Sequence, residues 1–379
     1  MQVTPQAYHP HMRVILALAL VISCLEPAAL GSQSSRDPVR AALARRIHEA
    51  RQGTGAVVGL LTPEGRSFAA YGRVSVGAQE ATADTIFEIG SITKIFTAFL
   101  LAEMVERGEV ALDDPVRRYL PAAVMVPSRG GREISLADLA THTSGLPRES
   151  VDVDVNSDTN PYTGYTARDL YAFLAGYRLQ RDPGSQWEYS NVGFGLMGHA
   201  LALRAGMSYE DLLRWRIFEP LAMTHTTVTL DAEQLSRRAT GYNAKLLPLP
   251  AWSGGVIAPA GGVHSTAADM LKFGAAVLDS QSALKAVFAR MTSVKRPSEE
   301  ARVQQALGWN LFRLGPNEIV AHSGGTFGFQ SRLIVDTTRK RVVVAWINGR
   351  GPAVNDLVGL ALDRATLASA SAAQAPLAF

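Results

Sequence analysis

The sequence predicts a mixed α/β domain, built on an antiparallel five-stranded sheet flanked by helices and interrupted by an inserted all-α domain. Strand patterns occur in the first and last thirds of the 379 residues, whereas the middle carries helical patterns with Pro- and Gly-rich joints. Two N-terminal strands alone cannot form a stable sheet, so we expect them to join the three strands near the C-terminus. The predicted limits are 39–111 and 262–368 for the α/β domain and 112–261 for the helical domain.

The first third is predicted to form two helices and two strands. The run Gly55-Ala-Val-Val-Gly-Leu-Leu61 is typical of a strand, and Pro63-Glu-Gly65 indicates a hairpin turn directly after it. A later helical pattern begins at Ser91 and ends before Gly108, a residue that favours helix ends. The expected elements are a helix at 39–52, strands at 55–61 and 67–76, and a helix at 91–107.

Helical periodicity continues through the middle, and strand patterns return near the end. The expected helices lie at 136–142, 167–177, 192–204, 209–218, 268–278 and 283–291, and a last one at 354–367. The expected C-terminal strands lie at 307–314, 318–323, 330–335 and 341–347, and the last three are joined by short turns as in a meander. The polar stretch at 145–166 predicts a surface loop at the rim of a site, and the tail at 369–379 predicts frayed chain.

The N-terminal segment 1–31 has the three-part form of a secretory signal. Arg13 precedes an apolar run from Val14 to Leu25, and Met12 is an alternative first residue. Cys24, the only cysteine, stands either in a lipoprotein-processing box, where it would be lipidated, or simply in the apolar signal core. We therefore expect an exported protein, either periplasmic, anchored to a membrane as a lipoprotein, or secreted. No transmembrane span is expected in the mature chain, because no later apolar stretch reaches about twenty residues.

Composition excludes several function classes. The net charge of +3 is mild, and the basic residues come in short runs without interleaved aromatic side chains, so no nucleic-acid partner is expected. The histidines lack metal-ligand spacing, and no glycine-rich cofactor loop follows a strand. We therefore expect no metal and no cofactor, and a small molecule or a short peptide as the partner.

Ser91-Ile-Thr-Lys94 provides the first candidate site. The serine hydroxyl and the lysine amine lie one helical turn apart, which puts them on the same face at a helix start. Lys94 can accept a proton near neutral pH only if burial or neighbouring cations lower its pKa, and the apolar residues Ile92, Ile95 and Phe96 favour burial. Taken alone, the pattern is more typical of a helix cap followed by a solvated lysine.

Two further segments carry candidate residues. Tyr189-Ser-Asn191 follows a turn and precedes a helix, so that a phenol and a carboxamide can project into a cleft, although a packed tyrosine and an asparagine helix cap are the simpler interpretation. His322-Ser-Gly-Gly325 ends a predicted strand, and its glycines would let a substrate lie against the backbone. The candidate set is therefore Ser91, Lys94 and Tyr189 as catalytic residues, with Asn191, His322, Gly324 and Gly325 in substrate binding and the proton network.

In combination, these segments resemble the β-lactamase and penicillin-binding-protein superfamily of serine hydrolases. The likeness is to class C β-lactamases, to D,D-peptidases with a histidine in the third motif and to esterases of the same fold, and it implies a β-lactamase/transpeptidase-like fold. It extends over about 57–363 in this chain. The matching pieces, in order, are Phe87-Glu-Ile-Gly-Ser-Ile-Thr-Lys94, Leu139-Ala-Thr-His-Thr-Ser-Gly-Leu146, Pro183-Gly184 with Tyr189-Ser-Asn191, Phe218-Glu-Pro-Leu221, Pro259-Ala-Gly-Gly262, and His322-Ser-Gly324.

The resemblance implies that Ser91 is acylated while Lys94 and Tyr189 carry its proton to the leaving group. It also implies an oxyanion hole from the backbone N–H groups of Ser91 and Gly325. Many β-lactamases carry a lysine where this chain has His322, and an unperturbed imidazole is charged in only about a quarter of molecules at pH 7. Carboxylate recognition should then be weaker or fall to an arginine such as Arg332 or Arg350.

The substrate class stays open at this stage. A β-lactam, a D-alanyl peptide or another D-amino-acid amide, and a short-chain ester all fit an acyl-enzyme mechanism. A catalytically silent cell-wall binding protein that retains the fold is a separate alternative.

Overall fold

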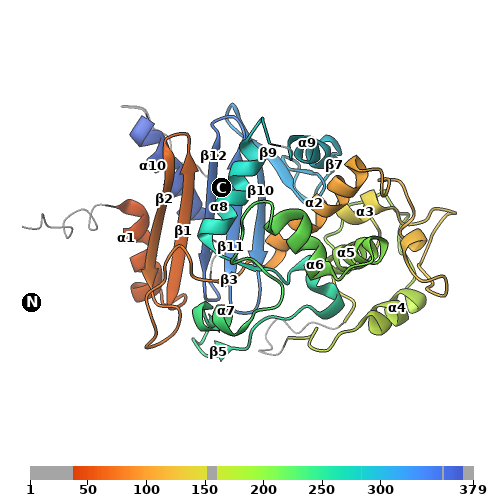
Figure 1. Ribbon diagram of the computed structural model, residues 1–379, viewed down its shortest axis with the longest axis horizontal. Helices are drawn as coiled ribbons and strands as arrows, with labels where there is room; N and C mark the ends of the chain where they lie inside the picture. Colours follow the sequence, from red (N-terminus) through yellow and green to blue (C-terminus); the bar gives the residue numbers. More distant parts are fainter. Residues whose placement is uncertain (1–36, 152–159, 283, 352–353, 370–379) are drawn as a thin grey trace, which may run out of the picture. The chain divides into compact units, whose positions relative to one another are not determined.

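The computed structural model describes residues 37–151, 160–282, 284–351 and 354–369 (Figure 1). The predicted signal segment with Cys24, the tail from residue 370 and part of the 145–166 loop lie outside the described residues.

The sheet joins the two ends of the chain, as the sequence predicts. Strands β1 (Gly55–Thr62) and β2 (Gly65–Gly72) form the N-terminal hairpin, and β1 pairs antiparallel with β12 (Arg341–Ile347). Strands β11 (Gln330–Asp336) and β10 (Asn317–Gly325) continue the sheet beyond β12 (Figure 1). The antiparallel sheet with flanking helices confirms the predicted fold class.

The sheet is wider than the five strands predicted. Within the described residues it has eight strands, in the order β2-β1-β12-β11-β10-β9-β8-β7. One of the strands beyond these five is β9 (Asn310–Leu314), which lies within the strand expected at 307–314. The other two, β8 (Gln304–Gln305) and β7 (Arg296–Pro297), were not predicted. A two-residue strand shows no alternation of apolar and polar residues, so β7 and β8 leave no signal in the sequence. Two further short pairs form elsewhere, β3 (Phe87–Glu88) with β6 (His264–Ser265) and β4 (Gly241–Tyr242) with β5 (Pro248–Leu249).

Both faces of β1 and β12 are covered, which explains why these two strands are almost entirely apolar. Ala56 and Val58 of β1 point into a core that also contains residues of α1 (Pro38–Ala44) and α10 (Asn355–Ser369). Val57 points to the opposite side, into the core with α2 (Thr93–Glu106) and α8 (Ala267–Leu278). A strand that is buried on both faces has no polar side to alternate with.

Helices occupy most of the middle of the chain. They are α3 (Leu136–Ala140), α4 (Ala167–Gly176), α5 (Asn191–Ala205), α6 (Tyr209–Leu213) and α7 (Ala232–Arg237), with α9 (Lys285–Ser293) further on. Short 3₁₀ segments lie at Val116–Tyr119 and Gly255–Ala260, and π-helical turns extend α1 at Arg45–Glu49 and α6 at Arg214–Phe218. The domain limits at 112 and 261 stay a prediction.

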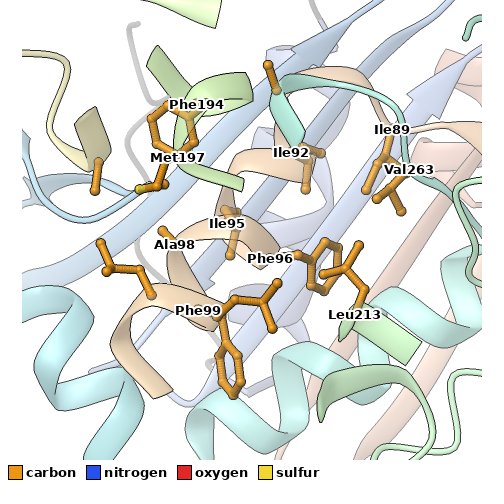
Figure 2. Close-up of a cluster of buried hydrophobic side chains, with 14 of the residues drawn as sticks. Ile89, Ile92, Ile95, Phe96, Ala98, Phe99, Phe194, Met197, Leu213 and Val263 are labelled. Atoms are coloured by element: carbon orange, nitrogen blue, oxygen red, sulfur yellow. The ribbon is translucent and has the colours of Figure 1, made fainter. Parts of the chain in front are cut away.

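Helix α2 is buried on nearly all sides, and this makes it a rigid support. Ile95 and Phe96 have no exposed surface, and Phe99 is almost fully buried. Figure 2 shows these side chains surrounded by others from α5, α6 and the segment before β6, including Phe194, Met197, Leu213 and Val263. In the part of the chain that is described, no helix combines the length and apolar character needed to cross a membrane.

Candidate active site

Ser91 lies where the chain passes from β3 into α2. A 3₁₀ turn at Gly90–Ile92 precedes the helix, and Gly90 has a φ of 52°, in the left-handed region that favours glycine. A Cβ on Gly90 would lie 2.6 Å from the backbone nitrogen of Gly325 at the end of β10. The turn that carries Ser91 therefore packs directly against the end of β10, and the two backbone N–H groups expected to form an oxyanion hole belong to these neighbouring segments.

Lys94 is fully buried and has three polar neighbours. Its Nζ lies 3.2 Å from Ser91 Oγ, 2.6 Å from Asn191 Oδ1 and 2.6 Å from the carbonyl oxygen of Ala260. The carboxamide and carbonyl oxygens can only accept, so they take two N–H bonds, whereas the serine hydroxyl can also donate. The arrangement therefore suits a neutral amine whose lone pair faces the Ser91 hydroxyl.

The electrostatic surroundings of Lys94 favour that neutral form. Burial lowers the pKa of Lys94 well below 10.5, the nearby Glu149 carboxylate raises it in part, and the positive charge of Arg148 lowers it further. Because burial is the largest of these effects, the pKa of the amine moves toward neutrality. The burial that the sequence led us to expect is present, and it comes from the packing around α2.

Tyr189, just before α5, and Asn191, the first residue of α5, both lie close to Lys94. Lys94 Nζ lies 4.7 Å from the centroid of the Tyr189 ring. Burial raises the pKa of Tyr189 to about 12, and this effect outweighs that of a hydrogen bond with Ser91, which lowers the pKa. The helix cap is Ser190, whose Oγ accepts a hydrogen bond from Gly193 N at 2.8 Å. The alternative of Asn191 as the cap is therefore wrong, because Ser190 fills that position and leaves the Asn191 side chain to contact Lys94.

His322 lies at the end of β10 as a neutral, buried ring. Its Nδ1 is 2.6 Å from the carbonyl oxygen of Ser323, which can only accept, so Nδ1 carries the proton and Nε2 is the acceptor nitrogen. Burial lowers the pKa of His322 to about 3, and a positive charge on Lys94, when that amine is protonated, acts in the same direction. The imidazole is thus neutral at pH 7 and supplies no fixed positive charge.

Gly324 allows β10 to approach the turn that carries Ser91. A Cβ at this position would lie 2.0 Å from the carbonyl oxygen of Ile89 and 2.3 Å from Ser331 Oγ.

Gly324→Ala is expected to push the end of β10 away and to slow labelling of Ser91 by a fluorophosphonate about 100-fold, since a displacement of about 1 Å costs that much in a positioned site. Gly176→Ala on α4, where nothing lies within 4 Å, is the control. Equal labelling rates for both variants would contradict the prediction.

The sequence did not single out several residues that complete the site. Glu149 accepts a hydrogen bond from Asn191 Nδ2 at 2.7 Å, which orients the carboxamide so that its oxygen faces Lys94. His142 accepts from the backbone of Ser190 at 3.0 Å, and its ring stacks on that of Tyr189 with centroids 4.3 Å apart. His142 lies within the Leu139–Leu146 segment quoted for the resemblance, and Glu149 within the loop expected at a rim, but neither pattern indicated a contact.

A cavity of about 860 Å³ opens beside Tyr189. Its polar lining includes Arg148, Arg181 and Arg296, together with Glu188 and Glu299. Arg148 also lies over the Tyr189 ring, 4.7 Å from its centroid, while Arg181 pairs with Glu188. The cavity therefore presents three guanidinium groups and two carboxylates at the Tyr189 end of the site.

The two arginines expected to bind a carboxylate lie in different places. Arg332 on β11 donates a hydrogen bond to Ser323 Oγ at 2.7 Å, directly beside the glycines that face Ser91. Arg350 lies over the ring of Phe327, 5.6 Å from its centroid. No group of three or more His, Cys, Asp or Glu side chains in the described residues could hold a metal ion.

Buried neutral histidines are expected to make the protein sensitive to acid. Burial, reinforced by the charge of Arg238, lowers the pKa of His264 on β6 from 6.5 to about 4. Below pH 6.5 the unfolded chain binds a proton at this position that the folded chain does not, so the free energy of unfolding falls with pH until about pH 4. The loss is about 1.4 kcal/mol per pH unit.

This effect can be isolated with His264→Leu. Urea unfolding at pH 7.5 and pH 4.5 should show a loss of stability in the wild-type protein that is smaller in the variant by about 2 kcal/mol. Identical pH dependence of the two proteins would show that His264 takes up its proton in the folded state as readily as in the unfolded chain.

Comparisons with known proteins place these features in context. A family model described as Beta-lactamase matches residues 40–368. The D-alanyl-D-alanine-carboxypeptidase/endopeptidase AmpH of Escherichia coli is 32% identical over 227 residues, which span 58% of this chain but only 56% of that protein. A β-lactamase of Yersinia enterocolitica is 27% identical over 291 residues, 74% of this chain and 71% of that protein. A solved class C β-lactamase from Rhodobacter sphaeroides superposes with a TM-score of 0.73 at 28% identity, covering 88% of this chain and 99% of the other.

Proposed function

This chain belongs to the β-lactamase family of serine hydrolases, and on that premise we propose that it hydrolyses an amide or ester through an acyl-enzyme on Ser91. The observation that carries the proposal is the buried Lys94 amine, which lies 3.2 Å from Ser91 Oγ with its other polar neighbours restricted to acceptors. Such an amine can take the hydroxyl proton as Ser91 attacks a carbonyl carbon.

The proton then has a path to the leaving group. Tyr189, with its pKa raised to about 12, is a neutral phenol at pH 7 and acts as the donor to the departing nitrogen or oxygen, regaining a proton from Lys94. The backbone N–H groups of Ser91 and Gly325 donate to the oxyanion, each worth about 3 kcal/mol in comparable sites. His322, neutral at pH 7, can accept a hydrogen bond at Nε2 beside this network. Water then attacks the acyl-enzyme by the reverse sequence of proton transfers.

Among the substrate classes, a D-alanyl peptide with a free C-terminal carboxylate is favoured. The cavity beside Tyr189, where the leaving group would depart, is lined by Arg148, Arg181 and Arg296. Arg332, which donates a hydrogen bond to Ser323, adds a guanidinium group beside the end of β10. A carboxylate on the leaving group would meet these charges, in agreement with the arginine role expected once a lysine is absent at position 322.

An ester is the second candidate, because one observation favours it. Neutral His322 offers no fixed charge where a carboxylate would otherwise be received, and esters need no such charge. Turnover of nitrocefin, a D-alanyl-D-alanine peptide and p-nitrophenyl butyrate should therefore be compared on purified protein. Preference for the peptide supports the first candidate, and preference for the butyrate supports the second. If none of the three is hydrolysed and neither a penicillin nor a fluorophosphonate labels the protein, the result would support a catalytically silent binding protein.

We also propose that residues 1–31 direct export, with the protein acting in the periplasm, on a membrane as a lipoprotein, or outside the cell. The support is the three-part form of that segment. Determination of the mature N-terminus tests this proposal. A start at a lipidated Cys24 would identify a lipoprotein, and a start at or near residue 32 would identify a cleaved signal. Retention of the whole segment would contradict export.

A further inference from the structure

Glu149 places a carboxylate at the Asn191 end of the site. Its Oε1 accepts a hydrogen bond from Asn191 Nδ2 at 2.7 Å, and its Oε2 accepts one from the Tyr162 hydroxyl at 2.5 Å. The side chain nevertheless keeps 18% of its surface exposed. The carboxylate is therefore held from two sides and still reaches solvent.

This carboxylate retains capacity for another partner. An ionised carboxylate can accept about four hydrogen bonds. Among the described residues, Asn191 and Tyr162 each donate a hydrogen bond to one oxygen. Arg148 Nε lies 3.6 Å from Oε1, close enough for an ion pair but beyond hydrogen-bond distance. A donor brought by a substrate can therefore still bind to Glu149.

The negative charge is not needed to orient Asn191. An uncharged amide oxygen in the same place would accept the same hydrogen bond from Asn191 Nδ2. The charge even opposes the proposed proton transfer, because Glu149 raises the pKa of Lys94 against the effect of burial. Because the carboxylate is partly exposed to solvent, it can also attract a positive charge that a substrate brings.

The charges of the site are distributed unevenly. Arg181 and Arg296 line the cavity beside Tyr189, and Glu149 lies beside Asn191. Arg148 lies between them, over the Tyr189 ring and 3.6 Å from Glu149 Oε1. This step rests on the proposed function: if Tyr189 donates its proton to the leaving group, the leaving group occupies the arginine-lined cavity. The acyl group of the substrate then lies toward Asn191 and Glu149.

We propose that Glu149 determines specificity, selecting acyl donors that carry an ammonium group. The ammonium would form an ion pair with the carboxylate while the scissile carbonyl lies at Ser91. Two kinds of substrate present an ammonium group. One is a D-amino acid with a free α-amino group. The other is a peptide in which the residue before the one that acylates Ser91 carries an ammonium on its side chain.

The test uses two pairs of p-nitroanilide substrates matched except for charge. In the first pair, the D-alanyl anilide carries an α-ammonium where the D-lactyl anilide carries a hydroxyl. In the second pair, the α-acetyl-lysyl-D-alanyl anilide keeps the charged lysine side chain, which is acetylated and neutral in the diacetyl-lysyl-D-alanyl anilide. We expect kcat/KM to be about tenfold higher for the charged member of at least one pair, equivalent to about 1.4 kcal/mol. In Glu149→Gln this preference should fall to about one. The pair that shows it identifies the source of the ammonium.

Two controls separate this inference from its premise. Glu299→Gln removes a carboxylate from the arginine-lined cavity and should leave the preference unchanged. Glu149→Gln should also move the acid limb of kcat/KM for the uncharged substrates to lower pH, because Lys94 loses a neighbouring negative charge. No preference in the wild-type protein, or one that survives in Glu149→Gln, would overturn the proposal while turnover itself stands. If no substrate turns over and a labelled penicillin fails to acylate Ser91, the proposed function fails and the inference with it.

Discussion

Ser91→Ala is expected to lower kcat/KM by about 10⁴- to 10⁶-fold, the loss seen when a serine nucleophile is removed from a hydrolase. Alanine lacks the oxygen that would bond to the substrate carbonyl, whereas the buried packing of α2 and the contacts of Lys94 with Asn191 and Ala260 remain. Stability should change by only about 1 to 2 kcal/mol, because the hydrogen bonds of Ser91 with Lys94 and Tyr189 are lost at a partly exposed position.

Intact-mass measurement after a slow acylating inhibitor provides the sharper readout. The wild-type protein should gain one adduct, peptide mapping should place it on Ser91, and Ser91→Ala should gain none. Ser298→Ala, on the rim of the cavity beside Tyr189, is the matched control and should be acylated as the wild type is. An adduct on another residue of Ser91→Ala would show that the nucleophile has been misassigned.

Lys94→Arg is expected to lower kcat/KM by about 10³- to 10⁴-fold, close to the loss in Lys94→Met. Arginine keeps a positive charge beside Asn191 and Ala260, but its guanidinium does not lose a proton in the accessible pH range. If Lys94 served only as a fixed cation, arginine would preserve most of the activity. Comparison of the two variants therefore separates proton acceptance from charge.

The pH dependence gives a second measurement for Lys94. Its lowered pKa means that the neutral amine appears well below pH 10.5, so kcat/KM of the wild type should rise with pH along an acid limb that both variants lack. Burial keeps the pKa of His322 at about 3, so His322 cannot produce a limb near neutrality. Thermal unfolding confirms that the variants are folded, and an unchanged limb in Lys94→Met would exclude Lys94 as its source.

The main elements of the fold were predictable because their signals are local. The strands β1 and β12 are apolar except for one end residue each, and the spacing of Ser91 and Lys94 places both on one helical turn. The two-residue strands β7 and β8 were not predicted, since β8 forms by pairing with the edge of β9, and β7 forms by pairing with β8. Their positions depend on pairing rather than on their own residues.

By itself, then, the sequence determined the order of the elements, the antiparallel sheet and the candidates Ser91, Lys94, Tyr189, Asn191 and His322, through periodicity and the combination of motifs. Only the tertiary structure decided which atoms meet. Lys94 contacts Asn191 and the Ala260 carbonyl across 97 and 166 residues of chain. Glu149 and the neutral state of His322 likewise depend on burial and neighbours from distant segments. Periodicity reports the faces of a single element, whereas desolvation and hydrogen-bond partners arise only when separate elements pack together.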